Sequence, residues 1–389
     1  MSFSEFRPTK NDPDKLVRTC TSTTMAINTL MLDFSVETSR VTDAKEWSAM
    51  KALMAKVIGG YIADIAEVND MQMGGGGHLS LYTATRGTFI TLRGYPKGLV
   101  SLNIEYYKAD ADEHLLTFEQ NRSLDSELCF ALNATRSKLF PPLRRGATLD
   151  VYLNSSDERI LEYDIDSVVF EENSPYQKVQ IVHSKSLGNL LILDELQNLS
   201  ERDLIYTETL MQRGKVDYKG KEVVILGGGD GALLYELLKE EPAFVTMMEL
   251  DEVVLRACRE HLRGCCGNCL DQLKGDKYEI IVDDCVKSLD KMIKDGKKVD
   301  FVFGDLTDIP VSTSPQGEAW DFIRLILNKA MQVLKPKGMY MTHGNGASSP
   351  QSLKMFEEQL NNLKVPVEFT TDRAFVPSFL EDWVFYQVR

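Results

Sequence analysis

One short segment constrains the fold of this chain more than any other. Residues 223–226 (Val-Val-Ile-Leu) form a short apolar run, which predicts a fully buried strand. Glycines at 227, 228, 229 and 231 then let the backbone turn tightly and approach a ligand closely, and 232–239 is expected to be a helix. A strand, a glycine turn and a helix N-terminus together predict a nucleoside-binding site of the doubly wound α/β type.

Asp230 is the unusual member of this glycine loop. A carboxylate at this position would repel a pyrophosphate, so the expected ligand is cationic or carries no phosphate there. The formal net charge of −14 also suits a cationic small molecule and argues against a nucleic acid or an anionic membrane as partner. Composition therefore agrees with the loop.

The sequence predicts a cytoplasmic protein without a bound metal. It has no apolar run of membrane-spanning length, and its first residues lack the order of a signal peptide. The seven cysteines are an odd number in a large chain, which favours reduced thiols. Cys265, Cys266 and Cys269 lack a second Cys/His pair at zinc-finger spacing, so we expect ordinary thiols there.

Before the glycine loop, the pattern predicts a lead-in and two domains. Residues 1–20 are expected to be disordered. Residues 21–140 predict an α+β domain with one antiparallel sheet and a helix on one face, followed by a helical connector over 112–139. Residues 141–200 predict a small β-hairpin domain. The expected strands are 25–34, 79–83, 88–93, 98–105, 149–152, 160–163, 167–171, 177–184 and 189–193, and the expected helix is 43–58.

From 201 to 389 strands alternate with helices, which predicts a mostly parallel sheet. The last two strands could close it as an antiparallel pair. The fold class is therefore α/β, with a Rossmann-like doubly wound catalytic domain after the two smaller domains. Its further strands are expected at 244–249, 278–282, 301–303, 338–342, 365–369 and 383–388.

Acidic residues follow four successive strands of this predicted sheet. In such a fold, ligands bind beyond the carboxyl ends of the strands. A carboxylate after the second strand would bind ribose hydroxyls, and one after the third would lie near an adenine amino group. These acids are Asp230, Glu249 with Asp251, Asp283 with Asp284, and Asp305. Together they favour a nucleoside that carries a cationic group.

Two other classes of nucleoside-binding enzyme fit part of this pattern. Ala232 in the sixth position is an accepted variant of the dinucleotide-binding motif, so the glycines alone do not exclude a dehydrogenase. Asp230 argues against it, because it would face the pyrophosphate. An S-adenosylmethionine-dependent methyltransferase remains a second alternative, although Asp230 would repel the methionine carboxylate.

The motifs resemble those of the polyamine aminopropyltransferases, and especially of the members that form spermine. The resemblance covers roughly residues 24–389. The family motifs at the strand ends lie at 227–231, 249–251, 283–285 and 304–307. At the entry to the catalytic domain, the matching segments are Ser174-Pro-Tyr-Gln177, 190–193 and 203–207. The segments that resemble the spermine-forming members are 305–315, 163–166, 324–327, 377–381 and 383–386. The N-terminal domain resembles S-adenosylmethionine decarboxylase through 93–99, without that enzyme's Glu-Ser-Ser processing sequence, so decarboxylase activity is not expected.

The resemblance implies transfer of an aminopropyl group from decarboxylated S-adenosylmethionine to spermidine, which gives spermine, methylthioadenosine and a proton. Asp305 would act as the base that deprotonates the acceptor amine, and Asp230 would hold a cationic amine. No cofactor or metal is implied, since decarboxylated S-adenosylmethionine is a co-substrate. A homodimer through the N-terminal domain is expected.

The same resemblance assigns the remaining site residues. The donor nucleoside would contact Gln177, Gly227, Gly229, Asp230, Glu249 and, on the ribose side, Asp251, with Asp284 and Cys285 on the adenine side. Tyr206 and Glu381 would line the polyamine tunnel with Asp305. Phe379 stands where the spermine-forming members tend to carry a tyrosine, which removes one polyamine contact. Three other hypotheses remain: thermospermine as the product, putrescine as the acceptor, and a non-catalytic regulator that binds polyamine or nucleoside.

Overall fold

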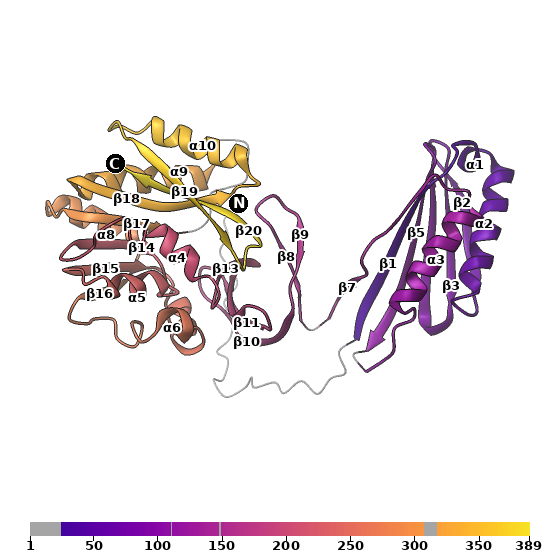
Figure 1. Ribbon diagram of the computed structural model, residues 1–389, viewed down its shortest axis with the longest axis horizontal. Coiled ribbons are helices and arrows are strands. Elements are labelled where there is room, and N and C mark those ends of the chain that lie inside the picture. The colour runs from indigo at the N-terminus through magenta and orange to yellow at the C-terminus, as the bar shows by residue number, and fades with distance from the viewer. Residues whose placement is uncertain (1–24, 110, 148, 307–316) are drawn as a thin grey trace, which may run out of the picture. The chain divides into compact units, whose positions relative to one another are not determined.

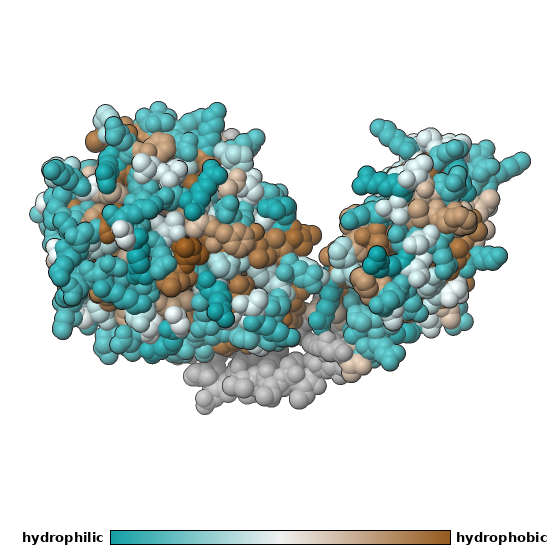
Figure 2. Space-filling view, viewed as in Figure 1, coloured by the Kyte–Doolittle hydropathy of each residue, from teal (hydrophilic) through white to brown (hydrophobic). Residues whose placement is uncertain are grey.

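The computed structural model describes residues 25–109, 111–147, 149–306 and 317–389. The chain divides into two compact units, with the boundary after Asp150. Each unit has its own hydrophobic core. On the face shown in Figure 2, the surface of both units is mostly hydrophilic and is interrupted by small groups of hydrophobic side chains. Among the described residues, no helix combines the length and the apolar character needed to cross a bilayer.

The first unit is an antiparallel sheet that packs against helices, as the sequence predicts for an α+β domain (Figure 1). The strand order is β2-β3-β4-β5-β1-β6, and β7 also pairs with β1. The elements are β1 (Met25–Ser35), α1 (Ser39–Thr42), α2 (Ala44–Gly59), β2 (Ala66–Met73), β3 (Gly77–Ala84), β4 (Thr88–Tyr95), β5 (Leu99–Ala109), α3 (Phe118–Ala131), β6 (Arg136–Leu139) and β7 (Leu143–Arg145).

Alternation along the strands builds the core of this unit. Leu30, Leu32 and Phe34 of β1 are buried and share one hydrophobic cluster with Trp47 and Met50 of α2. The predicted helical connector over 112–139 is wrong at both ends. Only 118–131 is helical, and Arg136–Leu139 instead pairs with β1 as the edge strand β6. Strand β2 was not predicted, because an edge strand with exposed polar residues carries no hydrophobic alternation.

The second unit begins with short antiparallel strands. Four of the predicted strands, 160–163, 167–171, 177–184 and 189–193, are present as β9 to β12. The predicted strand 149–152 is misplaced, since β8 begins only at Tyr152. One further strand, β13, extends the sheet of order β10-β11-β12-β13, and β8 pairs with β9. The elements are β8 (Tyr152–Asn154), β9 (Ile160–Glu162), β10 (Ile165–Asn173), β11 (Lys178–Ser184), β12 (Gly188–Leu193) and β13 (Leu196–Ser200). Their hydrophobic residues Val179, Ile181 and Leu191 join the same cluster as the large sheet.

The large sheet has the order β16-β15-β14-β17-β18-β20-β19 and is Rossmann-like. The strands from β14 to β18 are parallel, and β20 runs antiparallel to both of its neighbours. Its elements are α4 (Leu204–Leu210), β14 (Glu222–Gly227), α5 (Ala232–Lys239), β15 (Phe244–Glu249), α6 (Glu252–His261), α7 (Arg263–Cys266), β16 (Tyr278–Val282), α8 (Cys285–Lys294), β17 (Val299–Asp305), α9 (Glu318–Val333), β18 (Leu334–Gly346), α10 (Pro350–Asn361), β19 (Phe369–Val376) and β20 (Glu381–Val388).

Helices cover both faces of this sheet. Val223 and Ile225 of β14 pack in one cluster with residues of α5 and α6, and Val224 and Leu226 pack in another with residues of α8, α9 and α10. Both faces of β14 are therefore buried, which explains the unbroken apolar run in its sequence. The antiparallel end of the sheet is confirmed, but the predicted strand 365–369 is misplaced and the strand begins at Phe369. Pro366 within the predicted range has no N–H to donate to a neighbouring strand.

Candidate functional site

The glycine loop brings β14 against the end of β17. Gly227, Gly228 and Gly231 have φ angles of +80°, +76° and +78°, a region that glycine adopts without steric cost. The N–H of Gly228 donates to the carbonyl oxygen of Asp305 at 3.0 Å. A Cβ on Gly227 would lie 2.1 Å from that same oxygen, so only glycine allows this approach. The glycine loop and the backbone of Asp305 are therefore held in direct contact.

A cavity of about 440 Å³ opens beside this loop. The structure brings nearly all predicted site residues to its wall: Gln177, Tyr206, Gly227, Gly229, Asp230, Glu249, Asp251, Asp284, Cys285 and Asp305. Further lining residues that the sequence analysis did not assign to the site include Tyr176, Leu250, Leu306, Phe322 and His343. Phe379 also lines the wall. The cavity lies at the carboxyl edge of the parallel strands, as the fold predicts.

Asp230 stands at the start of helix α5. Its Oδ1 accepts a hydrogen bond from the N–H of Ala232 at 2.8 Å. Burial raises the pKa of Asp230 to about 7, and the nearby charge of Asp305 contributes in the same direction. A positive charge in the cavity would stabilise the ionised form of Asp230, because it would offset both the cost of burial and the repulsion from Asp305.

Glu249 is the second carboxylate of the cavity. Burial raises its pKa to about 7, and the charge of Asp251 acts in the same direction. Its Oε1 accepts from the N–H of Asp251 at 2.8 Å. A Cβ on Gly229 would meet Oε2 of Glu249 at 2.7 Å, so the glycine loop and this acid are in direct contact. These contacts fix the Glu249 carboxylate beside the loop, and its predicted contact with ribose hydroxyls stays a prediction.

Asp305 ends β17 and faces α4. The hydroxyl of Tyr206 donates to Oδ1 of Asp305 at 3.2 Å. Burial raises the pKa of Asp305, while the charge of His343 and the hydrogen bond from Tyr206 act to lower it. Asp230 and Asp305, whose pKa values are both raised, share one cavity, and the charge of each disfavours the ionisation of the other.

Asp251 has a different surrounding from the other acids. It is 2% exposed, and its Oδ2 accepts from Ser174 Oγ at 2.7 Å and from Gln177 Nε2 at 3.1 Å. Its Oδ1 accepts from the N–H of Val253 at 3.0 Å and caps α6. Asp251 therefore ties the β10–β11 turn to the large sheet and orients Gln177, whose predicted contact with the ribose stays a prediction.

Asp284 and Cys285 begin helix α8. Oδ1 of Asp284 accepts from the N–H of Val286 at 2.8 Å and caps the helix. Burial raises the pKa of the Cys285 thiol to about 11, which keeps it in the unreactive thiol form. Asp283 lies on the outside of this turn, where its Oδ1 accepts from the N–H of Asp284 and from Lys287 Nζ.

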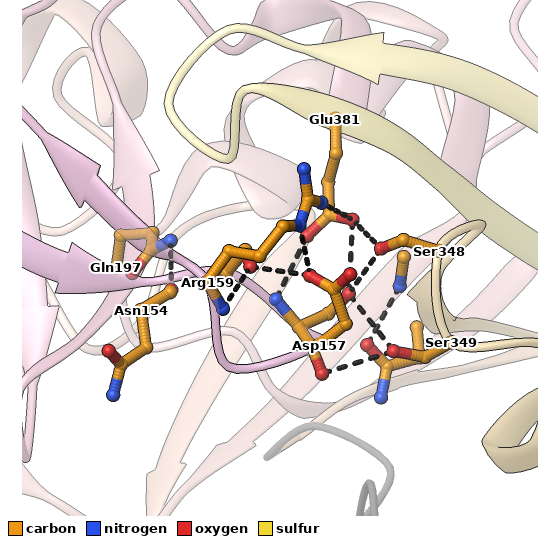
Figure 3. A network of polar contacts seen from close by, with 11 residues as sticks. Asn154, Asp157, Arg159, Gln197, Ser348, Ser349 and Glu381 are labelled. Carbon is orange, nitrogen blue, oxygen red and sulfur yellow. Dashed lines mark hydrogen bonds and ion pairs between the residues drawn. The ribbon is translucent and has the colours of Figure 1, made fainter. Parts of the chain in front are cut away.

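Glu381 is the one predicted site residue that is absent from the described lining of this cavity. It is 8% exposed and lies in the polar network of Figure 3. Its Oε1 accepts from the N–H of Ser156 at 3.0 Å, and its Oε2 accepts from the hydroxyls of Ser156 and Ser348. Arg159 lies 4.0 Å from Oε2. The network joins the β8–β9 turn to the start of β20, and a role of Glu381 in polyamine binding stays a prediction.

The cysteines of the 265–269 segment pack behind the glycine loop. Sγ of Cys269 donates to the carbonyl oxygen of Gly231 at 3.4 Å. Burial raises the pKa of the Cys266 thiol to about 11. In the described part of the chain, no group of three or more His, Cys, Asp or Glu side chains is placed to hold a metal ion.

His343 is the most informative residue that sequence reasoning missed. It lies near the end of β18, one residue beyond the predicted strand over 338–342. Extending the argument about strand ends to a fifth strand would have found it. Leu250 and Phe322 carry no comparable signal, because an apolar residue next to a strand or within a helix is normally core. Tyr176 belongs to the quoted Ser174-Pro-Tyr-Gln177 motif, in which only Gln177 was assigned to the site.

Replacing Gly227 with alanine should destabilise the protein and displace Asp305. Alanine at φ +80° costs about 1–3 kcal/mol in backbone strain, and its Cβ would also meet the Asp305 carbonyl. Gly220→Ala is the matched control, because Gly220 has φ +67° with open space around its Cβ position. Urea unfolding should show a clearly larger loss for Gly227→Ala, and equal losses would mean that the close approach is unimportant.

Comparison with known proteins identifies relatives for the second unit. Residues 203–389 match the family described as spermine/spermidine synthase domain, and residues 152–201 match the spermidine synthase tetramerisation domain. Thermospermine synthase ACAULIS5 of Arabidopsis thaliana is 28% identical over 233 residues, which are 58% of this chain and 66% of that protein. A polyamine aminopropyltransferase of Aeropyrum pernix is 28% identical over 228 residues, or 57% of this chain and 68% of that protein.

Two solved structures share the fold. The spermidine synthase of Thermotoga maritima aligns with a TM-score of 0.50 and 19% identity over 62% of this chain and 78% of that chain. A spermidine synthase in complex with the transition-state analogue AdoDATO aligns with a TM-score of 0.51 and 20% identity, over 62% of this chain and 80% of that one.

Proposed function

Residues 152–389 belong to the spermine/spermidine synthase family, and on that premise we propose that this protein is an aminopropyltransferase. It transfers the aminopropyl group of decarboxylated S-adenosylmethionine to spermidine and forms spermine, methylthioadenosine and a proton. The observation that carries this proposal is the convergence of Asp230, Glu249 and Asp305 on one cavity. Three carboxylates in one partly buried space favour a substrate pair that is cationic at the reacting end.

The donor nucleoside fits the half of the cavity around the glycine loop. Gly227 and Gly229 allow its close approach, and Glu249 accepts hydrogen bonds from the ribose hydroxyls. Gln177, oriented by Asp251, supports the same ribose. Asp284 and Cys285 border the adenine, with Asp284 as the hydrogen-bond acceptor for its amino group.

The chemical step needs a deprotonated acceptor amine. In its neutral form, the amine nitrogen attacks the aminopropyl carbon next to the sulfonium, a C–N bond forms, and the C–S bond breaks with its electron pair left on sulfur. Methylthioadenosine leaves as a neutral molecule, and Asp305 takes the proton of the amine before it passes to solvent. Asp230 holds an ammonium beside the reacting carbon, and the acidic cavity offsets the repulsion between the two cations.

Acceptor choice is the finer part of the proposal. We assign spermidine because the motifs resemble those of the spermine-forming members. Phe379, which lines the cavity, counts against this assignment, because it lacks the tyrosine hydroxyl that those members tend to carry. Tyr206 lines the same side and hydrogen-bonds the proposed base. Glu381 serves the acceptor only if its network with Ser156 and Ser348 rearranges.

A product assay tests the proposal. The purified protein is incubated with decarboxylated S-adenosylmethionine and, separately, with putrescine or spermidine, and the polyamines are separated so that spermine and thermospermine are distinguished. Spermine from spermidine, at a kcat/KM well above that for putrescine, is the expected result. Thermospermine or spermidine as the main product would refute the assigned acceptor specificity, and the absence of any new polyamine would refute the activity.

Three further properties belong to the same proposal. The reaction as written needs neither metal nor cofactor. Self-association is supported by the match of residues 152–201 to a tetramerisation domain, and we assign a homodimer formed through the first unit, the one that resembles S-adenosylmethionine decarboxylase. A location in the cytoplasm would give the enzyme access to its substrates.

Polyamine binding should strengthen with pH and release protons. The pKa values of Asp230 and Glu249 are both raised to about 7, so each acid is partly protonated near neutrality, and Asp230 must ionise to bind an ammonium. Calorimetric titration with spermidine in the presence of methylthioadenosine should give a higher affinity at pH 8 than at pH 6. In buffers of different ionisation enthalpy, the heats at pH 6.5 should differ by the proton release, and identical heats would contradict the raised pKa values.

A further inference from the structure

The backbone on both sides of Asp305 is fixed by neighbouring elements. Three consecutive carbonyl oxygens in this segment each lie within hydrogen-bond distance of a donor: Gly304 with Thr342 Oγ1 at 2.7 Å, Asp305 with the N–H of Gly228 at 3.0 Å, and Leu306 with His343 Nε2 at 3.0 Å. Because a carbonyl oxygen only accepts, Nε2 of His343 carries the proton of its contact. The imidazole therefore holds the residue that directly follows the proposed base.

His343 also belongs to the cavity. It is 5% exposed, lines the wall together with Asp305, and pairs with Phe385 across the sheet. Its ring centroid lies 5.9 Å from that of Tyr206, whose hydroxyl donates to Asp305. On another side, it stacks on Trp383 at 6.4 Å with an interplanar angle of 30°. Packing on these sides fixes the direction of the ring.

The surroundings of His343 are acidic on one side and uncharged on the other. The titratable groups that face it are the carboxyl of Asp305 from β17, the phenol of Tyr206 from α4 and, across the cavity, the carboxyl of Asp230 from the glycine loop. The neighbours on and just before β20 are the uncharged rings of Phe379, Trp383 and Phe385. A proton on the imidazole therefore favours the ionised form of Asp305 and opposes the effect of burial on its pKa.

We propose that His343 is a positioning residue for the aminopropyl transfer. It holds the Leu306 carbonyl so that the Asp305 carboxylate meets the acceptor amine in a fixed orientation, and it places an ionisable imidazole in the same cavity wall as that carboxylate. This inference rests on the proposed function, because it assigns His343 a role through Asp305 in that reaction.

Two substitutions separate position from charge. His343→Gln keeps an N–H that can donate to Leu306 but carries no charge, and His343→Leu removes both. His183→Gln is the matched control, because His183 is a half-buried histidine of β11 that is bound to Asp166 outside the cavity lining. For each protein, kcat and KM are measured from about pH 5.5 to about pH 9, and the affinity for methylthioadenosine is measured by calorimetry.

We expect His343→Leu to lose about tenfold to a hundredfold in kcat at every pH, with a nearly unchanged affinity for methylthioadenosine. His343→Gln should recover most of kcat at pH 8, yet the acid limb of its pH profile should move upward by about one pH unit. His183→Gln should match the wild type.

A wild-type kcat in His343→Leu, or an unmoved acid limb in His343→Gln, would overturn the inference. If His343→Leu no longer binds methylthioadenosine, its fold has been lost, and the pH profile of His343→Gln alone decides. Failure of the proposed function is a separate outcome, because in that case the wild-type protein itself forms no polyamine product.

Discussion

Asp305→Asn will lower kcat by about a hundredfold to ten-thousandfold while the affinity for methylthioadenosine stays near that of the wild type. The amide has the shape of the carboxyl group and can still accept from Tyr206, so the fold and the hydrogen bond at 3.2 Å are kept. It cannot take a proton from the acceptor amine. Steady-state kinetics of product formation, together with calorimetry of methylthioadenosine binding, measure both expectations.

The size of this effect follows from the position of Asp305. It is an ionisable group at the junction of the glycine loop and the α4 face of the cavity, and Gly228 fixes its backbone. Asp276→Asn is the isosteric control, because Asp276 is an exposed residue outside the cavity lining. Asp305→Asn with more than a tenth of the wild-type kcat would remove Asp305 as the base and leave the rate to positioning alone.

Asp230→Asn will weaken substrate binding but raise the stability of the free protein at pH 8. The KM for both cationic substrates should rise by about tenfold to a hundredfold and kcat should fall, because a neutral amide offsets an ammonium less well than a carboxylate. The free protein should gain stability at pH 8, since the substitution removes a charge that burial and Asp305 both disfavour. The amide oxygen can still accept from Ala232.

The sign of the stability effect follows from the raised pKa. An acid whose pKa is higher in the folded state than in the unfolded state stabilises the fold at low pH, and this contribution is lost as the pH rises through the folded value of about 7. The melting temperature of Asp230→Asn should therefore exceed that of the wild type at pH 8. It should approach the wild-type value at pH 4, where the side chain at position 230 is neutral in the folded state of both proteins. A less stable variant at pH 8 would show that Asp230 is already paired with a cation in the free protein.

The glycine loop and its acids could be predicted from sequence because the fold itself brings them together. Carboxyl ends of parallel strands share one edge, so Asp230, Glu249, Asp284 and Asp305 had to converge once the strands were identified. Helix α5 follows the loop at the predicted residues, because its periodicity is regular and its start is marked by Gly231.

The rest depended on contacts between distant segments. Nothing in the local sequence of Asp251 shows that it binds Ser174 and Gln177, which lie 77 and 74 positions earlier. The network of Glu381 with Ser156 depends on a two-stranded turn 225 positions away. Local patterns record periodicity and turns, whereas such pairings are fixed only when the tertiary fold forms.

The edge strands were missed for a related reason. β2 is exposed over most of its length, and β6 follows a helix without a change in hydrophobic pattern. Each is a strand through backbone hydrogen bonds to a neighbouring strand rather than through burial of alternate side chains. His343 lies one residue beyond the predicted end of β18, where strand boundaries are least defined by sequence.

Transfer of label from the donor tests the central claim most directly. The protein is incubated with spermidine and decarboxylated S-adenosylmethionine that carries one isotope in its aminopropyl group and another in its S-methyl group, and both products are quantified over time. We predict that the aminopropyl label appears in spermine with one methylthioadenosine released per spermine formed, and that the methyl label stays in methylthioadenosine. Methyl label in the polyamine, or methylthioadenosine released without an aminopropylated product, would contradict the account.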